Sequence, residues 1–140
     1  MSSSVAAVDV VDVMDEHACL EHLHSASLGR IAFRSGDDIE MFPVNYACDG
    51  SIVVYRTAAG SRLAIAPRDH VAFEVDGWDP DAKVGWSVVL KGIVLDVTAG
   101  SDPFSKSLRE RKVVPLAPGR RERWMAVYPS SITGRRFRRS

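Results

Sequence analysis

The stretch RTAAGSRL gathers residue types that could bind a phosphate group. Arg56 and Thr57 end a strand-like run, and Gly60 permits close approach of the backbone just before Ser61 and Arg62. Converging N–H groups, hydroxyls and guanidinium charges suit a phosphate monoester. The same letters also suit a short helix with Ser61 as its N-cap and Arg62 in solvent. The chemistry of these residues alone leaves both interpretations open.

The rest of the sequence offers little other catalytic chemistry. His17, His22 and His24 fall on one expected helix, without the spacing of the helical zinc motif, and we interpret them as exposed positions. Cys19 and Cys48 are too few for a disulfide framework and are expected to be reduced structural thiols. The Gly-x-Ser-x-Gly elbow is also missing. We therefore assign no catalytic residue and no metal site.

Length and charge limit the classes of protein that remain. With 140 residues, 46% of them hydrophobic and 26% charged, the chain is expected to form a single globular domain over residues 1–140. No apolar run approaches the roughly 20 residues that cross a bilayer, and the start lacks the basic region of a secretory signal. We therefore expect a cytoplasmic protein without membrane contact.

Charge is distributed unevenly along the chain although the formal net charge is zero. Acidic residues crowd the start, and seven arginines lie between Arg120 and Arg139. These ends of opposite sign could meet, within one chain or between two. Nucleic-acid binding through the arginine-rich tail is one hypothesis, but a solvated tail explains the same residues, and zero net charge argues against nucleic acid.

The hydrophobic pattern predicts a mainly β protein. LGRIAF alternates apolar and polar residues, as a half-buried strand does. Strands are expected at 28–33, 39–47, 51–57, 70–78, 84–97 and 125–137, and helices at 15–27, 61–67 and 102–112. About six strands joined by hairpins, with no alternation of strands and helices, favour a small antiparallel barrel.

Turn and breaker residues add detail to this expectation. Pro43 lacks the N–H that a sheet ladder needs, so its strand should be an edge, a bulge or a break. Asp49-Gly50 indicates a tight hairpin, and Gly92 indicates a bend in the longest strand. About residues 1–14 are expected to form a mobile arm, and VVPLAPGRR is the most linker-like loop.

Four pieces of the chain, taken in order, carry a family resemblance. LGRIAF, FPVNYACDGSIVVYRTAAGSRL, HVAFEVD and VGWSVVLKG span about residues 28 to 95. Together they resemble the pyridoxamine 5'-phosphate oxidase-like family of flavin-binding split barrels. The resemblance implies a split antiparallel β-barrel with a few short helices. It also implies a homodimer that holds flavin mononucleotide (FMN) in each of two clefts at the subunit interface.

The resemblance also implies a set of cofactor-binding residues. The segment matching RTAAGSRL holds the phosphate, the segment from Pro43 runs along the isoalloxazine edge, and the strand with Trp86 lies near the ring and ribityl chain. The implied residues are Pro43, Val44, Asn45, Tyr46, Arg56, Thr57, Ser61, Arg62, Trp86 and Ser87. The family commonly has lysine where Arg62 stands, and arginine keeps the charge but changes the donor geometry. For Trp86 the alternative of a core aromatic stays open.

The C-terminal strand corresponds more loosely to the family pattern. Trp124, Arg135 and Arg136 match the strand that reaches the cofactor of the partner subunit. A solvated basic tail would explain the two arginines equally well, so we keep both interpretations.

Two functional hypotheses follow from the resemblance. The first is an oxidoreductase that uses FMN or a deazaflavin to pass a hydride between a reduced nicotinamide or deazaflavin and a small organic acceptor. Flavins carry this chemistry themselves, which accounts for the missing catalytic residues. The second is a non-catalytic module that holds flavin or haem as a carrier or sensor. The sequence does not separate the two.

Overall fold

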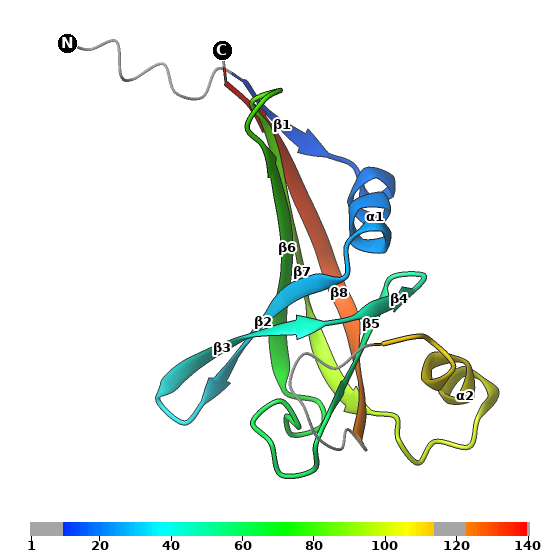
Figure 1. The fold of residues 1–140 in the computed structure, drawn as a ribbon. Helices are drawn as coiled ribbons and strands as arrows, with labels where there is room; N and C mark the ends of the chain where they lie inside the picture. The colour runs from blue at the N-terminus through cyan, green and yellow to red at the C-terminus, as the bar shows by residue number, and fades with distance from the viewer. Residues whose placement is uncertain (1–9, 114–122, 140) are drawn as a thin grey trace.

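The computed structural model describes residues 10–113 and 123–139 and shows a mainly β protein (Figure 1). Within these residues, eight strands and two helices follow one another. They are β1 (Val10–Met14), α1 (Glu16–Ser25), β2 (Leu28–Ser35), β3 (Asp38–Asn45), β4 (Ala47–Asp49), β5 (Ile52–Thr57), β6 (His70–Asp79), β7 (Val84–Asp96), α2 (Pro103–Arg109) and β8 (Arg123–Arg138). The helices predicted around α1 and α2 and the six predicted strands are confirmed. Neither described helix is long and apolar enough to cross a membrane.

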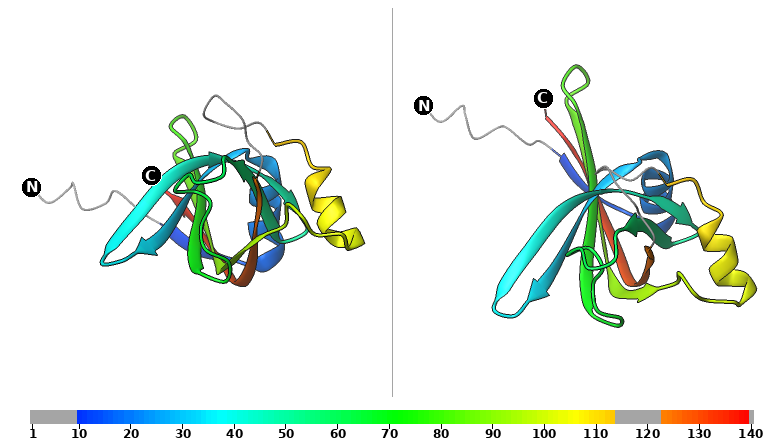
Figure 2. Two further views of the ribbon diagram at one scale, coloured as in Figure 1. Left: turned by 90° about the horizontal axis from the view of Figure 1, so that it is seen from below. Right: turned by 60° about the horizontal axis from the view of Figure 1, so that its bottom comes forward.

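The strands form one antiparallel sheet that curls into a split barrel (Figure 2). Their order is β3-β2-β6-β7-β8-β5-β4, and β1 pairs with β8 outside this path. The two end strands, β3 and β4, are consecutive in the chain with only Tyr46 between them. The two ends of the sheet are therefore joined by the polypeptide itself and not by a ladder of hydrogen bonds. The barrel is split where β3 and β5 stand opposite each other without a ladder.

The turn and breaker residues act as expected. Pro43 lies on β3, an end strand that pairs only with β2. On the other edge of β3 there is no ladder, so the missing N–H of Pro43 removes no ladder hydrogen bond there. Gly50 has a φ of 59° in the hairpin between β4 and β5. The register of β7 against β8 shifts between Lys91 and Gly92. A Cβ at Gly92 would lie 2.0 Å from the carbonyl oxygen of Tyr128, so only glycine fits this bulge.

Two apolar clusters stabilise the fold. The larger fills the barrel with fully buried side chains such as Tyr55, Phe73 and Leu90, and α1 closes one side with Cys19 and Leu23. The smaller lies outside the barrel under α2, where Leu108 packs with residues of β5 and β8. Because successive strand residues face opposite sides, β5 contributes side chains to both clusters.

One predicted helix is wrong. Residues 61–67 form turns instead, held by hydrogen bonds from the Ser61 N–H to the Ala58 carbonyl and from the Ala64 N–H to the Ser61 carbonyl, both 3.1 Å. Gly60 has a φ of 79°, outside the helical region, and Pro67 follows soon after. The segment between them is too short to repay the cost of helix nucleation.

The N-terminal expectation needs correction over its last part. Residues 10–14, included in the expected mobile arm, form β1 and pair antiparallel with β8. Asp12 stands opposite Arg136 in this pairing, so the acidic start and the basic end meet within one chain. Residues 1–9 lie outside the described residues, as does nearly all of the expected loop VVPLAPGRR.

Candidate functional site

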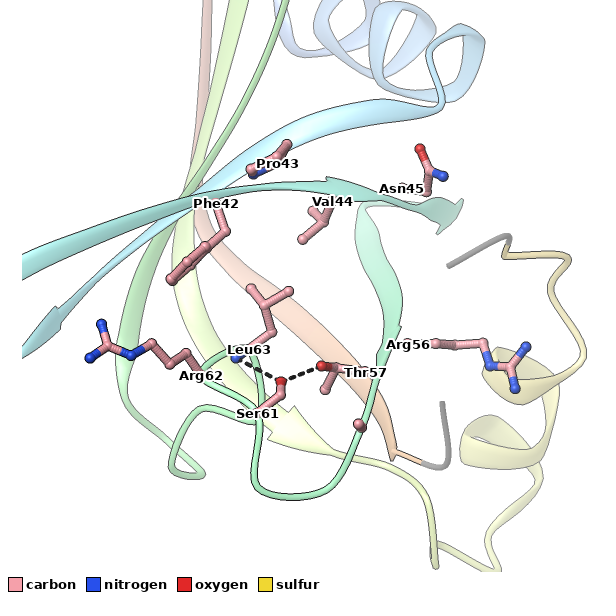
Figure 3. Close-up of a pocket in the computed structure, with 10 residues that line it drawn as sticks. Phe42, Pro43, Val44, Asn45, Arg56, Thr57, Ser61, Arg62 and Leu63 are labelled. Carbon is pink, nitrogen blue, oxygen red and sulfur yellow. Dashed lines mark hydrogen bonds between the residues drawn. The ribbon is translucent and has the colours of Figure 1, made fainter. Parts of the chain in front are cut away.

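A cleft of about 460 Å³ lies at the split of the barrel, between β3, β5 and the turn that follows β5 (Figure 3). This volume is typical of sites for small organic ligands. The lining residues are Phe42, Pro43, Val44, Asn45, Arg56, Thr57, Ala58, Ser61, Arg62 and Leu63. Seven of them are residues that the family resemblance implied. The structure therefore brings the two sequence segments, one from β3 and one after β5, to the same cleft.

An apolar wall borders one side of the cleft. It consists of Phe42 and Val44 from β3 and Leu63 from the turn, whose side chains point toward one another (Figure 3). Phe42 and Val44 are two residues apart, so the pleat of the strand places them on the same face. The family resemblance implies Val44 at this wall, but it does not include Phe42 or Leu63. The alternation of β3 is the signal that could have indicated Phe42.

A pair of hydroxyl groups lies below the apolar wall. Thr57 Oγ1 and Ser61 Oγ are 2.5 Å apart, and the Leu63 N–H donates to Ser61 Oγ at 3.1 Å. Thr57 is buried, with 4% of its surface exposed. One mutual hydrogen bond uses only one of the two hydroxyl protons. Among the described residues, the pair thus keeps one O–H group for a ligand oxygen in the cleft.

The barrel core positions this turn. The buried Tyr55 donates its hydroxyl to the Leu63 carbonyl at 2.8 Å, which fixes the far end of the turn against β5. Burial raises the pKa of Tyr55 well above its ordinary value, so the phenol stays a donor. At the near end, the positive φ of Gly60 lets the chain reverse. Ser61 thus reaches Thr57 through the geometry of a turn rather than as the cap of a helix.

The two arginines of the segment point away from the hydroxyl pair, in opposite directions (Figure 3). Arg56 precedes Thr57 on the strand and therefore faces the other side of β5. Its guanidinium carbon lies 4.9 Å from the ring centre of Trp124, the residue opposite it on β8. Arg62 forms an ion pair with Glu40 of β3. The structure thus brings the two hydroxyls together but leaves both guanidinium groups at the sides.

Tyr46 follows β3 but does not line the cleft. It is buried, its hydroxyl donates to the Leu23 carbonyl at 2.7 Å, and its ring meets Phe73 edge-on. Burial raises the pKa of its phenol far above the ordinary value. Tyr46 therefore connects the end of β3 to α1 by a hydrogen bond. Its neighbours Pro43 and Asn45 do line the cleft.

Trp86 lies on β7, away from this cleft. Its indole stacks on the ring of His22 in α1, with centroids 3.9 Å apart and planes 20° apart, and covers Gly77 of β6. Trp86 is half-buried and packs against the core. This position agrees with the alternative interpretation of Trp86 as a core aromatic. His22 is half-buried too, so the expectation that all three helix histidines are exposed is wrong for this one.

Ser87 faces the opposite side of the sheet from Trp86, in a shallow groove of about 540 Å³ on the outer face of β7, β8 and β1. The groove is lined by Val13, Ser87, Val89, Lys91, Thr133, Gly134 and Arg135. Two cations, Lys91 and Arg135, border it. In residues 10–113 and 123–139, no three His, Cys, Asp or Glu side chains cluster as metal ligands would.

The chain is similar to several known proteins over almost its full length. It is 29% identical to an uncharacterised protein of Mycobacterium tuberculosis over 142 residues, covering 97% of this chain and 91% of that protein. Its fold matches an FAD-binding protein of Mycobacterium smegmatis with a TM-score of 0.76 and 31% identity, covering 92% of this chain and 98% of that one.

A second solved structure agrees with the first. It is a candidate pyridoxamine 5'-phosphate oxidase of Corynebacterium glutamicum, with a TM-score of 0.78 and 30% identity, and the match covers 92% of this chain and 99% of that chain. The family model described as pyridoxamine 5'-phosphate oxidase matches residues 15–136, from the N-cap of α1 to near the end of β8. On this match and on the split-barrel fold, the chain belongs to the pyridoxamine 5'-phosphate oxidase family.

Proposed function

We propose that this protein binds a flavin in the cleft between β3, β5 and the turn after β5, and works as a flavin-dependent oxidoreductase. The observation that carries the proposal is the hydroxyl pair, Thr57 and Ser61, placed directly beside the apolar wall. A flavin nucleotide has the matching halves, a flat ring system and a phosphate. The family of the chain and the FAD-binding protein at 31% identity support this choice of ligand.

The residues of the cleft fit such a ligand. Phe42, Val44 and Leu63 offer apolar contact to a planar ring. The spare proton of the hydroxyl pair can be donated to a phosphate oxygen. Arg62 lines the same cleft, and its guanidinium, which pairs with Glu40, would turn toward these hydroxyls to reach a bound phosphate. In this proposal Thr57, Ser61 and Arg62 contact the phosphate. Arg56 contributes its positive charge from the other face of β5.

A bound flavin supplies hydride and electron transfer, so the chain itself needs no nucleophile. The work of the protein is then to bind the ring, orient it and exclude water from one face. We propose that the hydride passes between a reduced nicotinamide or deazaflavin and a small organic acceptor. The acceptor would approach the ring on the side that the apolar wall leaves open.

FMN is our first candidate for the flavin, with FAD and a deazaflavin as alternatives. FMN, FAD and a phosphorylated deazaflavin each carry a phosphate that the hydroxyl pair is suited to bind. The solved relative at 31% identity is an FAD-binding protein, which makes FAD a strong competitor. Direct comparison of the three ligands therefore belongs in the first experiment.

We also propose that the functional unit is a homodimer built on the outer face of the sheet. Exposed apolar side chains lie there, with 84% of Val13, 81% of Ile39 and 63% of Met41 accessible. Glu74 and Asp76 of β6 lie beside β7 on this face, and Lys91 and Arg135 follow on the next strands. A two-fold axis would place the acidic residues of one copy against the basic residues of the other.

The proposal is tested by titrating the purified protein with FMN, FAD, a deazaflavin and haem, followed by absorbance and fluorescence. We expect saturating binding of a flavin and a dimer by light scattering. The bound flavin should then be reduced by a nicotinamide and reoxidised by an added acceptor such as a quinone. A bound flavin inert to every donor would replace the oxidoreductase with a carrier or sensor, and no flavin binding would contradict the proposal.

A further inference from the structure

The ion pair between Arg62 and Glu40 joins the two sides of the cleft. Arg62 comes from the turn after β5 and Glu40 from β3. Glu40 lies two residues before Phe42, so the pleat of β3 places it on the same face as the apolar wall, next in line toward solvent. The Glu40 carboxylate is partly buried, with 22% of its side chain exposed, whereas the Arg62 side chain is 68% exposed.

This pair determines where the positive charge of the cleft lies. Figure 3 shows the guanidinium of Arg62 turned away from Thr57 and Ser61, on the side where Glu40 pairs with it. A phosphate at the hydroxyl pair can gain Arg62 only if the guanidinium leaves the carboxylate or is shared with it. Carboxylate and phosphate oxygens offer a guanidinium the same charge-assisted hydrogen bonds, so the two anions compete.

We propose that Glu40 sets the preference of the cleft among flavins, by competing with the ligand phosphate for Arg62. This inference rests on the proposed function. The competition matters most for a phosphate monoester, which carries a charge of about −1.5 to −2 near pH 7. FMN ends in such a monoester. FAD carries diester-like phosphates with about one charge each, and riboflavin carries none. Glu40 therefore disfavours FMN most, FAD less and riboflavin not at all.

The test uses Glu40→Gln, which keeps the size of the side chain and removes its charge. Dissociation constants for FMN, FAD and riboflavin are measured by flavin fluorescence at low and at high salt. We expect the variant to bind FMN about twofold to fivefold more tightly at low salt, the range for a partly exposed charge pair. The gain for FAD should be smaller and riboflavin should be unchanged. High salt should reduce the gains.

Two further variants separate this role from a general effect of charge. Glu21→Gln removes the same charge from an exposed position on α1, where Glu21 pairs with His17, and should leave all three affinities unchanged. In an Arg62→Gln background, Glu40→Gln should no longer improve FMN binding, because the competition acts through Arg62. Melting curves of each variant should stay close to wild type, since an ion pair in which Arg62 is 68% exposed adds little stability.

The outcomes distinguish this inference from the proposed function. Equal gains for all three flavins, a gain that persists without Arg62, or an equal effect of Glu21→Gln would each overturn the role of Glu40 while flavin binding stands. If neither wild type nor Glu40→Gln binds any flavin, the proposed function itself fails. A gain for FMN that exceeds the gain for FAD and disappears with Arg62 would establish the competition.

Discussion

Thr57 and Ser61, four residues apart in a segment without helix, bring their hydroxyl oxygens within 2.5 Å of each other. The contact exists because β5 ends at Thr57 and the chain reverses at Gly60, which has a positive φ. Ser61 Oγ also accepts the Leu63 N–H at 3.1 Å, as an N-cap oxygen would, but no helix follows it. The turn therefore leaves the hydroxyl pair at the cleft, beside the apolar wall.

Replacing Thr57 by valine should weaken the binding of FMN more than that of riboflavin. Valine keeps the shape of the buried side chain and removes one hydroxyl. The loss of a hydrogen bond to a charged phosphate costs about 1.5–3 kcal/mol, or roughly a tenfold to hundredfold rise in Kd. Fluorescence titration with both flavins measures the difference. Ser35→Ala, at the exposed end of β2, is the control, and equal losses for FMN and riboflavin would contradict a phosphate role.

Replacing His22 by phenylalanine should flatten the acid side of the stability profile. Burial, with a contribution from the charge of Arg136, lowers the pKa of His22 below its ordinary value of 6.5. The unfolded chain then binds this proton more readily than the folded chain. Stability from a neutral His22 is therefore complete above about pH 6.5 and is lost as pH falls through the folded pKa. Phenylalanine keeps the stacking on Trp86 and removes the titration.

Thermal melts between pH 5 and pH 8 check this expectation. Wild type should lose melting temperature on acidification more steeply than His22→Phe. Ser35→Ala, which removes no titratable group from an exposed position, should keep the wild-type slope. Parallel profiles for wild type and His22→Phe would show that His22 is as free to be protonated in the folded chain as in the unfolded one.

The strands could be predicted from the sequence because their signals are local. Alternation in LGRIAF, the Asp49-Gly50 hairpin and the bend at Gly92 all act within a few residues, and the structure retains each of them. β1 was missed because its partner, β8, lies more than a hundred residues away and nothing within Val10–Met14 indicates that pairing. A strand that is stabilised mainly by pairing with a distant strand is difficult to recognise from its own residues.

The cleft could be predicted as a set of segments but not as a set of side-chain directions. The segments on β3 and after β5 do meet. Arg56, however, points to the other face of β5, as the pleat requires of a neighbour of Thr57. The direction of Arg62 depends on Glu40, a residue of another strand that no local pattern connects to it. Trp86 lies outside the cleft because the ladder of β7 places it against α1, where it stacks on His22.

Replacing Gly92 by alanine should destabilise the fold through the bulge of β7. The new Cβ would lie 2.0 Å from the Tyr128 carbonyl oxygen, a backbone atom that no side-chain rotation can move. Forced overpacking of this kind costs about 1–3 kcal/mol. Gly36→Ala is a useful comparison, because Gly36 has a φ of 62° but open space around it, so only the backbone penalty applies. Urea unfolding measures both, and an equal or smaller loss at Gly92 would contradict the crowding.

Glu74 provides a second titration whose effect on stability is opposite in sign to that of His22. Burial, assisted by the neighbouring carboxylate of Asp76, raises its pKa from 4.5 to about 7, and Arg30 offsets part of this shift. Arg30 Nη1 lies 3.1 Å from Glu74 and 3.3 Å from Asp76, so one cation is shared by two carboxylates. The folded chain therefore binds this proton more readily than the unfolded chain. Between about pH 4.5 and pH 7, this group makes stability fall as pH rises.

Glu74→Gln should remove this penalty, because glutamine stays neutral at every pH. The variant should resemble wild type most closely near pH 5 and gain melting temperature relative to it toward pH 8. Arg30 keeps Asp76 as a partner in the variant. Because His22 works in the opposite direction, the difference between variant and wild type at each pH, at one protein concentration, is the quantity to follow. Glu110→Gln, at the exposed C-cap of α2, controls for the loss of one surface charge. A difference that stays constant from pH 5 to pH 8 would show that Glu74 titrates alike in both states.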